Sequence, residues 1–251
     1  MRNRLFATFL VLGPALLCAG PARAQADAVA AALAQAKSSD PATRYAGAEA
    51  LAGLPGPGSV SALSRLLADA DARVRQSAAS GLGRQGDRSA APALIAALKD
   101  PSAPTRFAAV RSLGSLRARA AVPALSGLLG DPDASMRRTV ALELGLIGDP
   151  AARRALSAAL NDPDEGTRLE AADALAHMGD SSGQEAALTG LRSKDPLSRR
   201  RAALALARGG DASALSALDG AFAEEKDPST RSTLDDARSR LRERLGLKQG
   251  R

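Results

Sequence analysis

The chain has 251 residues with 34 basic and 27 acidic side chains, one His, one Cys, no Trp, one Tyr and four Phe. A single His and a single Cys exclude a zinc site built on His or Cys clusters, and exclude an intramolecular disulfide. An aromatic content of 2% leaves no stacking platform for single-stranded nucleic acid. Hydrophobic and charged contents of 45% and 24% are those of a folded protein. We therefore expect a folded chain without a metal or a cofactor.

The first 24 residues have the order of a secretory signal peptide. Arg2 and Arg4 precede an apolar stretch from Leu5 to Gly20, and small residues follow at Ala22 and Ala24. This order predicts cleavage after Ala24 and a periplasmic or secreted protein.

Two other interpretations of this segment are less favoured. The apolar stretch of 16 residues is shorter than the roughly 20 that a membrane-spanning helix needs, so we expect no stable membrane insertion after cleavage. Lipidation at Cys18 is disfavoured because Leu17 stands where a small residue is expected.

An internal period of 31 residues runs through the rest of the chain. Each repeat arginine follows an Asp-Pro or Asp-Ala pair by four to six residues and precedes a leucine by seven, up to Leu206. Small or apolar residues fill the third and fourth positions, so each unit begins with a helix that has one apolar face. The repeat arginines are Arg44, Arg75, Arg106, Arg137, Arg168 and Arg199, and Arg231 follows at a spacing of 32.

A second apolar helix follows each Gly, Asp or Pro break, and Pro92 and Pro123 lie near the start of two of these helices. A single hairpin cannot cover its own apolar stripes, whereas stacked hairpins can. We therefore predict an all-α fold, a right-handed α-α superhelix (solenoid) of about six 31-residue helix-hairpin repeats with half-repeat caps. The repeat domain spans residues 25–251, with repeats starting near residues 40, 71, 100, 131, 162 and 195 and a C-terminal cap over 227–251.

The Asp-Pro, Arg, Ala-Ala and Leu-Gly pattern, as in residues 106–114, resembles short HEAT-like repeats of the bilin-lyase type. The resemblance covers essentially the whole chain after the leader. It implies an α-solenoid, and it is compatible with scaffolds, partner-binding modules and a chromophore-lyase subunit. A di-iron hydroxylase on a similar solenoid uses His-Glu pairs, and this chain has none.

The repeat arginines are interpreted as structural. Their strict period and the matched aspartates predict a ladder of ion pairs along the stack, within one unit or between neighbours. A basic binding ladder is the alternative.

Two surfaces are candidates for partner binding. We expect the second helices to line an inner groove with small residues and a few cations, namely Arg65, Lys99, Arg154 and Arg192. We expect an apolar patch on the outer face of the first helices, namely Phe107, Leu142, Leu146, Leu169 and Leu204. Plain solvent-facing positions and local packing are the alternative readings of these two sets.

These features predict an exported, non-enzymatic scaffold that binds another protein. The single histidine, His177, has no flagged nucleophile or orienting group beside it, so we assign no catalytic residue. One alternative is a bilin-lyase-like enzyme subunit that acts on a chromophore-bearing protein. The other is weak nucleic-acid binding through the basic C-terminal cap, because residues 199–251 hold 12 basic and 8 acidic side chains. Elsewhere the charges balance, and we expect no nucleic-acid partner.

Overall fold

The computed structural model describes the backbone of residues 20–247 and the side chains of residues 23–247. Within this part, fourteen α-helices and five short 3₁₀ turns form two layers, with no strand. One layer holds the even-numbered helices: α2 (Pro41–Ala52), α4 (Ala72–Gln85), α6 (Ala103–Ser115), α8 (Ala134–Ile147), α10 (Glu165–His177), α12 (Pro196–Gly209) and α14 (Pro228–Arg244). The other holds α1 (Gly20–Gln35), α3 (Pro57–Leu66), α5 (Ala91–Ala97), α7 (Val122–Gly127), α9 (Arg153–Ala159), α11 (Gln184–Gly190) and α13 (Ala212–Glu224).

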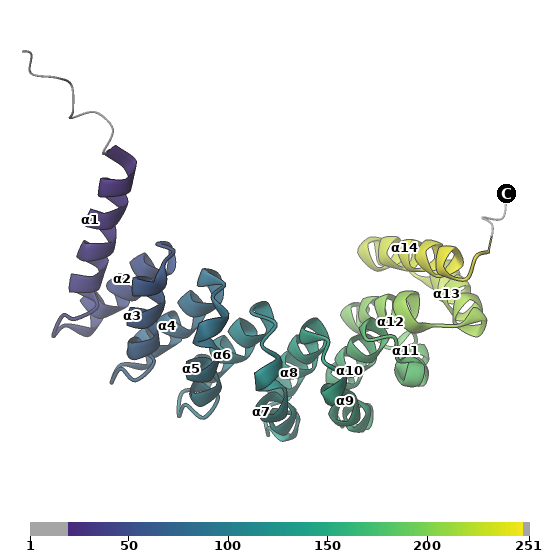
Figure 1. Cartoon of the computed structure of the whole chain (residues 1–251). Helices are drawn as coiled ribbons and strands as arrows, with labels where there is room; N and C mark the ends of the chain where they lie inside the picture. Colours follow the sequence, from purple (N-terminus) through teal and green to yellow (C-terminus); the bar gives the residue numbers. More distant parts are fainter. Residues whose placement is uncertain (1–19, 248–251) are drawn as a thin grey trace, which may run out of the picture.

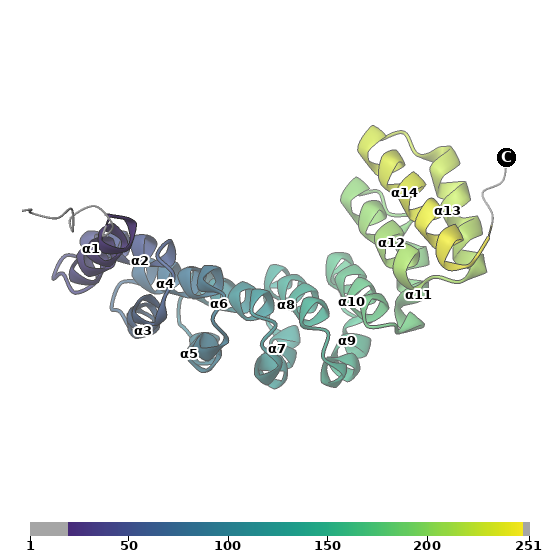
Figure 2. The ribbon, with the colours of Figure 1, turned by 45° about the horizontal axis from the view of Figure 1, so that its top comes forward.

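The stack of helices bends into an open arc (Figure 1). In both views the even-numbered helices lie on the inner side of the bend and the odd-numbered helices on its outer side (Figures 1 and 2). We call the even-numbered helices the inner layer, the odd-numbered helices the outer layer, and the solvent-exposed side of the inner layer the inner face.

The predicted all-α solenoid is confirmed. Each odd-numbered helix packs closely against the even-numbered helix that follows it, so the tight hairpins are α1–α2, α3–α4 and onward to α13–α14. The hairpin thus begins one helix earlier than the unit read from the sequence. The predicted leader, residues 1–24, lies almost entirely outside the described residues. Among the described helices, none is long and apolar enough to cross a membrane.

The two layers differ in how closely their helices approach one another. Successive inner helices pack along their lengths, whereas successive outer helices barely touch. Small residues allow the close approach: a Cβ added to Gly83 of α4 would lie 3.0 Å from Cα of Ser112 in α6, and one added to Gly145 would lie 2.9 Å from Cα of Ala174 in α10. A layer with shorter spacing must lie on the inside of a bend, so these contacts account for the direction of curvature.

The core between the layers is built from leucines at the predicted period. The leucine seven residues after each repeat arginine is fully buried, as at Leu82 and Leu113, and it meets outer-layer leucines such as Leu63 and Leu94. Burying a leucine side chain contributes about 1.5–3 kcal/mol, so this column supplies much of the stability of each repeat.

The aspartates before each repeat arginine fall into two columns with different roles. Four residues before the arginine, Asp40, Asp71, Asp133, Asp164, Asp195 and Asp227 cap the N-termini of their inner helices through side-chain oxygens. Six residues before the arginine, a second acidic side chain pairs with the repeat arginine of the preceding repeat. The sequence pattern did not separate these two sets of acids.

The predicted arginine ladder is present, and it runs between neighbouring repeats. Nε and Nη2 of Arg75 donate to the two carboxylate oxygens of Asp100 at 2.7 and 3.0 Å. Its Nη1 donates to the carbonyl oxygens of Asp69 and Ala70 in its own hairpin turn. Each such guanidinium therefore joins two successive turns, and its hydrogen bonds hold the pKa of the acceptor carboxyl below its usual value. The same rung is formed by Arg44 with Asp69, Arg137 with Asp162 and Arg199 with Glu225.

Two rungs of the ladder are missing. Ser193 stands at the acidic position that Arg168 would reach, and it donates instead to Glu165. Arg106 keeps its bonds to the carbonyls of its own turn but forms no ion pair with Asp131, although the spacing is unchanged. The junction between α6 and α8 therefore lacks a rung that the sequence predicts.

The ladder makes a testable contribution to stability. We expect Asp100→Ala to lower the free energy of unfolding by about 3 kcal/mol, because it leaves the largely buried guanidinium of Arg75 without its carboxylate. Asp131→Ala is a matched control, since Asp131 accepts the same kind of turn bond, from the Asp133 amide at 2.9 Å, but has no arginine partner. We expect this control to lose less than about 1 kcal/mol. Urea unfolding followed by circular dichroism measures both, and equal losses would contradict a structural role for the rung.

Candidate protein-binding surface

Ion pairs between successive helices bridge the inner face at two junctions, α2–α4 and α10–α12. Arg84 of α4 donates to Glu49 of α2 at 3.0 Å, and Arg208 of α12 donates to Asp173 of α10. In each pair the acid lies five residues after the repeat arginine of its own helix. The pairing arginine lies nine residues after the repeat arginine of the next inner helix. These positions face solvent on the inner side, so each pair bridges two helices across the inner face.

The same positions at the centre of the inner face form no ion pair among the described residues. Between α6 and α8 these positions hold Arg111 and Leu146, and between α8 and α10 they hold Leu142 and His177. All four residues are exposed. Leu142 and Leu146 are 42% and 44% exposed, and large apolar side chains exposed next to one another can mark an interaction surface. One turn apart on α8, they make an apolar ridge between Arg111 of α6 and His177 of α10. We call Arg111, Leu142, Leu146 and His177 the central site.

A buried carboxylate lies directly beside this ridge. Glu143 is 6% exposed and fits over Gly114 of α6, where an added Cβ would overlap its carboxyl group. Burial raises the pKa of Glu143 to about 7, and the charge of Arg111 opposes the shift only in part. The other repeats place small residues at this position, namely Ala50, Gly81, Ser112, Ala174 and Ala205. The carboxylate therefore gives the junction between α6 and α8 a packing unlike that of the other repeats.

The patch expected on an outer surface lies instead on the inner layer, and it is smaller than expected. Leu169 is 1% exposed and packs against Gly190 of α11, so it belongs to the core. Phe107 is partly buried against the core, and Leu204 is also partly buried. Phe107 and Leu169 directly follow their repeat arginines and pack against the core, whereas Tyr45 at the same position of α2 is 43% exposed, so the position in the repeat does not fix the exposure by itself. Of the expected set, Leu142 and Leu146 remain as a surface.

The cations expected to line an inner groove lie on the outer layer. Arg65 is in α3, Arg154 is in α9, and Lys99 and Arg192 follow α5 and α11; all four are exposed. The sequence pattern alone allows either helix of a hairpin to lie on the inner side of the bend. In the structure, the helix that carries the repeat arginine lies on that side.

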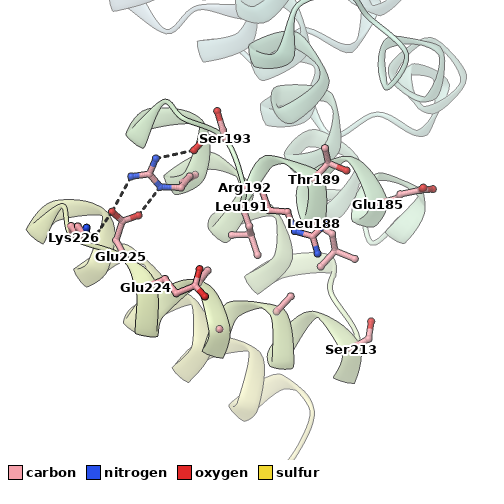
Figure 3. A pocket seen from close by; sticks show the side chains of 14 residues that line it. Glu185, Leu188, Thr189, Leu191, Arg192, Ser193, Ser213, Glu224, Glu225 and Lys226 are labelled. Carbon is pink, nitrogen blue, oxygen red and sulfur yellow. Dashed lines mark hydrogen bonds and ion pairs between the residues drawn. The ribbon is translucent and has the colours of Figure 1, made fainter.

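Arg192 borders a groove of about 970 Å³ between α11 and α13. Figure 3 shows Arg192 and Leu188 on the α11 side and Glu224 on the side of α13. The charged side chains around the groove balance, with Glu185 and Glu224 against Arg192 and Lys226. The groove follows from the wide spacing of the outer layer.

The basic C-terminal cap binds mainly to its own chain. Arg238 and Arg242 both donate to Asp219, and the guanidinium of Arg238 also stacks 4.3 Å from the centre of the Phe222 ring. Arg199 is held by Glu225, and Arg201 by Glu170. These contacts do not favour the nucleic-acid alternative, which needs free cations along a groove.

The sequence pattern missed two residues of this surface, Arg111 and Glu143. Both could have been found by aligning the repeats with one another. Glu143 interrupts a column of small residues, and Arg111 stands five residues after its repeat arginine, where Glu49 and Asp173 form bridges in other repeats.

Comparison with known proteins identifies the family. The family described as HEAT repeats matches residues 26–109, 63–139, 91–168 and 154–237. The chain belongs to the HEAT repeat family. No curated protein matches the chain. Over residues 23–247, no cluster of three or more His, Cys, Asp or Glu side chains is placed to hold a metal ion.

Solved HEAT-like structures resemble the chain over most of its length. A chain of the CpcE–CpcF complex of phycocyanin lyase from Nostoc sp. PCC7120 is 25% identical with a TM-score of 0.59, over 95% of this chain and 100% of that one. The Escherichia coli protein YibA is 21% identical with a TM-score of 0.65, over 88% and 83%. An archaeal HEAT-like repeats protein from Thermococcus onnurineus NA1 is 17% identical with a TM-score of 0.58, over 87% and 97%. The last two show the fold alone.

The buried carboxylate predicts a pH dependence of stability. The folded-state pKa of Glu143, about 7, lies above the ordinary value of 4.5, so between these pH values the folded chain holds a proton that the unfolded chain has released. The free energy of unfolding therefore falls as the pH rises through 7, by up to about 3 kcal/mol. The ladder carboxyls have lowered pKa values and contribute no slope in this range.

We expect Glu143→Gln to remove most of this slope when urea unfolding is compared at pH 5 and pH 8.5. Glu170 has a pKa raised by burial as well, so a smaller slope of the same sign should remain. Glu165→Gln, at a partly exposed site, is the control and should keep the slope of the unmodified chain. A Glu143→Gln slope equal to that control would show that the carboxylate is not buried as described.

Proposed function

We propose that this HEAT-repeat protein is a non-enzymatic scaffold that binds another protein through the inner face of its solenoid. The observation that carries the proposal is the central site, where Leu142 and Leu146 are exposed between helices that form no ion pair there. Contiguous apolar side chains exposed inside a polar rim are typical of protein interaction surfaces. The side chains of the site are exposed, whereas small molecules prefer enclosed pockets.

We further propose that the scaffold acts outside the cytoplasm after export. The support is the order of charged, apolar and small residues over positions 1–24. Fractionation of the host cell tests this part on its own, since a cytoplasmic protein that keeps residues 1–24 would contradict export but not protein binding.

A second candidate is a bilin-lyase-like subunit that acts on a chromophore-bearing protein. The likeness to a chain of the CpcE–CpcF complex, over the full length of that chain, is the observation that favours it. The visible absorbance of the protein purified from its own host separates the two functions. A bound pigment would favour the lyase, and a colourless protein with a stoichiometric partner would favour the scaffold.

The binding surface is tested by affinity capture of the tagged full-length protein from the envelope fraction of its host. We expect Leu142→Glu with Leu146→Glu to lose the partner, because two carboxylates would replace the apolar ridge at the centre of the interface. The matched control is Arg65→Glu with Arg154→Glu, two exposed positions on the outer layer, which we expect to retain it. Circular dichroism checks that both variants are folded. A partner retained by the first variant and lost by the second would overturn the placement on the inner face.

A further inference from the structure

The charge of the inner face is strongly one-sided. At the positions two before and one, two, five and nine after each repeat arginine, the helices from α2 to α12 carry seven arginines against three partly buried carboxylates. The arginines are Arg73, Arg84, Arg111, Arg138, Arg200, Arg201 and Arg208, and the acids are Glu49, Glu170 and Asp173. An acidic partner would be attracted to this face, and a basic one would be repelled.

Most of these arginines already have a carboxylate. Arg73 and Arg138 lie beside the helix-capping residues Asp71 and Asp164, and the inward-facing acids hold three others. Among the described residues, no carboxylate lies within ion-pair distance of the other two, Arg111 and Arg200. Arg200 is partly buried and donates to Ser229, whereas Arg111 is exposed next to the apolar ridge. Glu143 on the next helix is buried rather than presented at the surface, and it forms no ion pair with Arg111 among the described residues. The centre of the inner face therefore presents two leucines beside an exposed cation that has no carboxylate within ion-pair distance.

The backbone of this surface restricts the conformation of what binds there. Within α6, α8 and α10 the backbone hydrogen bonds are internal to the helices, so the surface offers side chains but no sheet edge. An extended segment would leave its own amide and carbonyl groups without partners when buried, which costs free energy. A helix satisfies these groups internally, and its apolar ridge can pack across Leu142 and Leu146, which lie one turn apart on α8.

We propose that the central site takes an acidic amphipathic helix of a partner protein, whose apolar side chains pack on Leu142 and Leu146 and whose carboxylates pair with Arg111. This rests on the proposed function, because it names the chemistry of the partner for the same inner face. A basic amphipathic helix and an extended acidic segment are the alternatives that the test separates.

Three labelled peptides of equal length probe the full repeat protein by fluorescence anisotropy. The first has leucines along one helical face and glutamates on its flanks, the second has lysines in place of the glutamates, and the third is the first with a central proline that prevents helix formation. We expect the acidic helix to bind at least tenfold more tightly than the other two at low salt. Its affinity should fall as sodium chloride is raised, since the attraction is electrostatic in part.

Matched variants locate the binding. Leu142→Glu with Leu146→Glu should weaken the acidic helix about thirtyfold or more, as expected for central apolar anchors. Arg111→Glu should weaken it about fivefold and tighten the lysine peptide, because the charge at the centre is reversed. Lys99→Glu makes the same reversal at an exposed position of the outer layer and should change neither affinity.

Three results would overturn the proposal: tighter binding of the lysine peptide, equal binding of the proline peptide, or no binding of any peptide. They leave the proposed function to its own test, because partner capture that depends on Leu142 and Leu146 would still place protein binding on the inner face. If both capture variants retain the partner while the acidic helix binds as expected, the proposed cellular role is contradicted instead.

Discussion

The shape of this protein depends on how closely its inner helices can approach one another. Gly83, Gly145 and the alanines around them let α4, α6, α8 and α10 pack backbone against side chain, while the outer helices remain apart. The difference in spacing bends the stack toward the arginine-bearing helices. Consequently those helices supply the inner face. The inner face is thus a product of the smallest residues in the repeat.

Polar contacts then fix the register of each step. The capping aspartates start the inner helices, and the arginine rungs tie each hairpin turn to the next one. Both devices relax at α6: Ser102 at its N-terminus makes no side-chain capping bond, and Arg106 makes no rung with Asp131. At the opposite edge of the same junction Glu143 is buried without a strong partner. The repeats on either side of the α6–α8 junction are therefore held together mainly by apolar packing.

Sequence reasoning found the parts of the structure that repeat and missed the parts that depend on phase. The 31-residue period and the buried leucines follow from helix periodicity, and the structure confirms them. The arginine ladder that the matched charges predict is present at four rungs. The sequence does not show which helix of the hairpin lies on the inner side of the bend, because either arrangement buries the same apolar residues. Arg65 and Lys99 were therefore placed on the wrong side. The burial of Leu169 does not follow either, because the periodicity of one helix does not show which side chains the next repeat covers.

The central site coincides with the junction that has the fewest polar restraints, and the two facts have a common physical basis. Ion pairs across the inner face, such as Arg84 with Glu49, tie successive inner helices together but occupy the charges that a partner could use. Where Arg111, Leu142 and Leu146 replace them, that source of stability is given up and the same groups are left exposed to solvent. A partner that covers the leucines and supplies a carboxylate to Arg111 would restore both the apolar contact and the charge pairing that the isolated repeat lacks. Binding and local stability are thereby coupled at this one junction, since whatever binds only the folded chain stabilises it in proportion to its affinity.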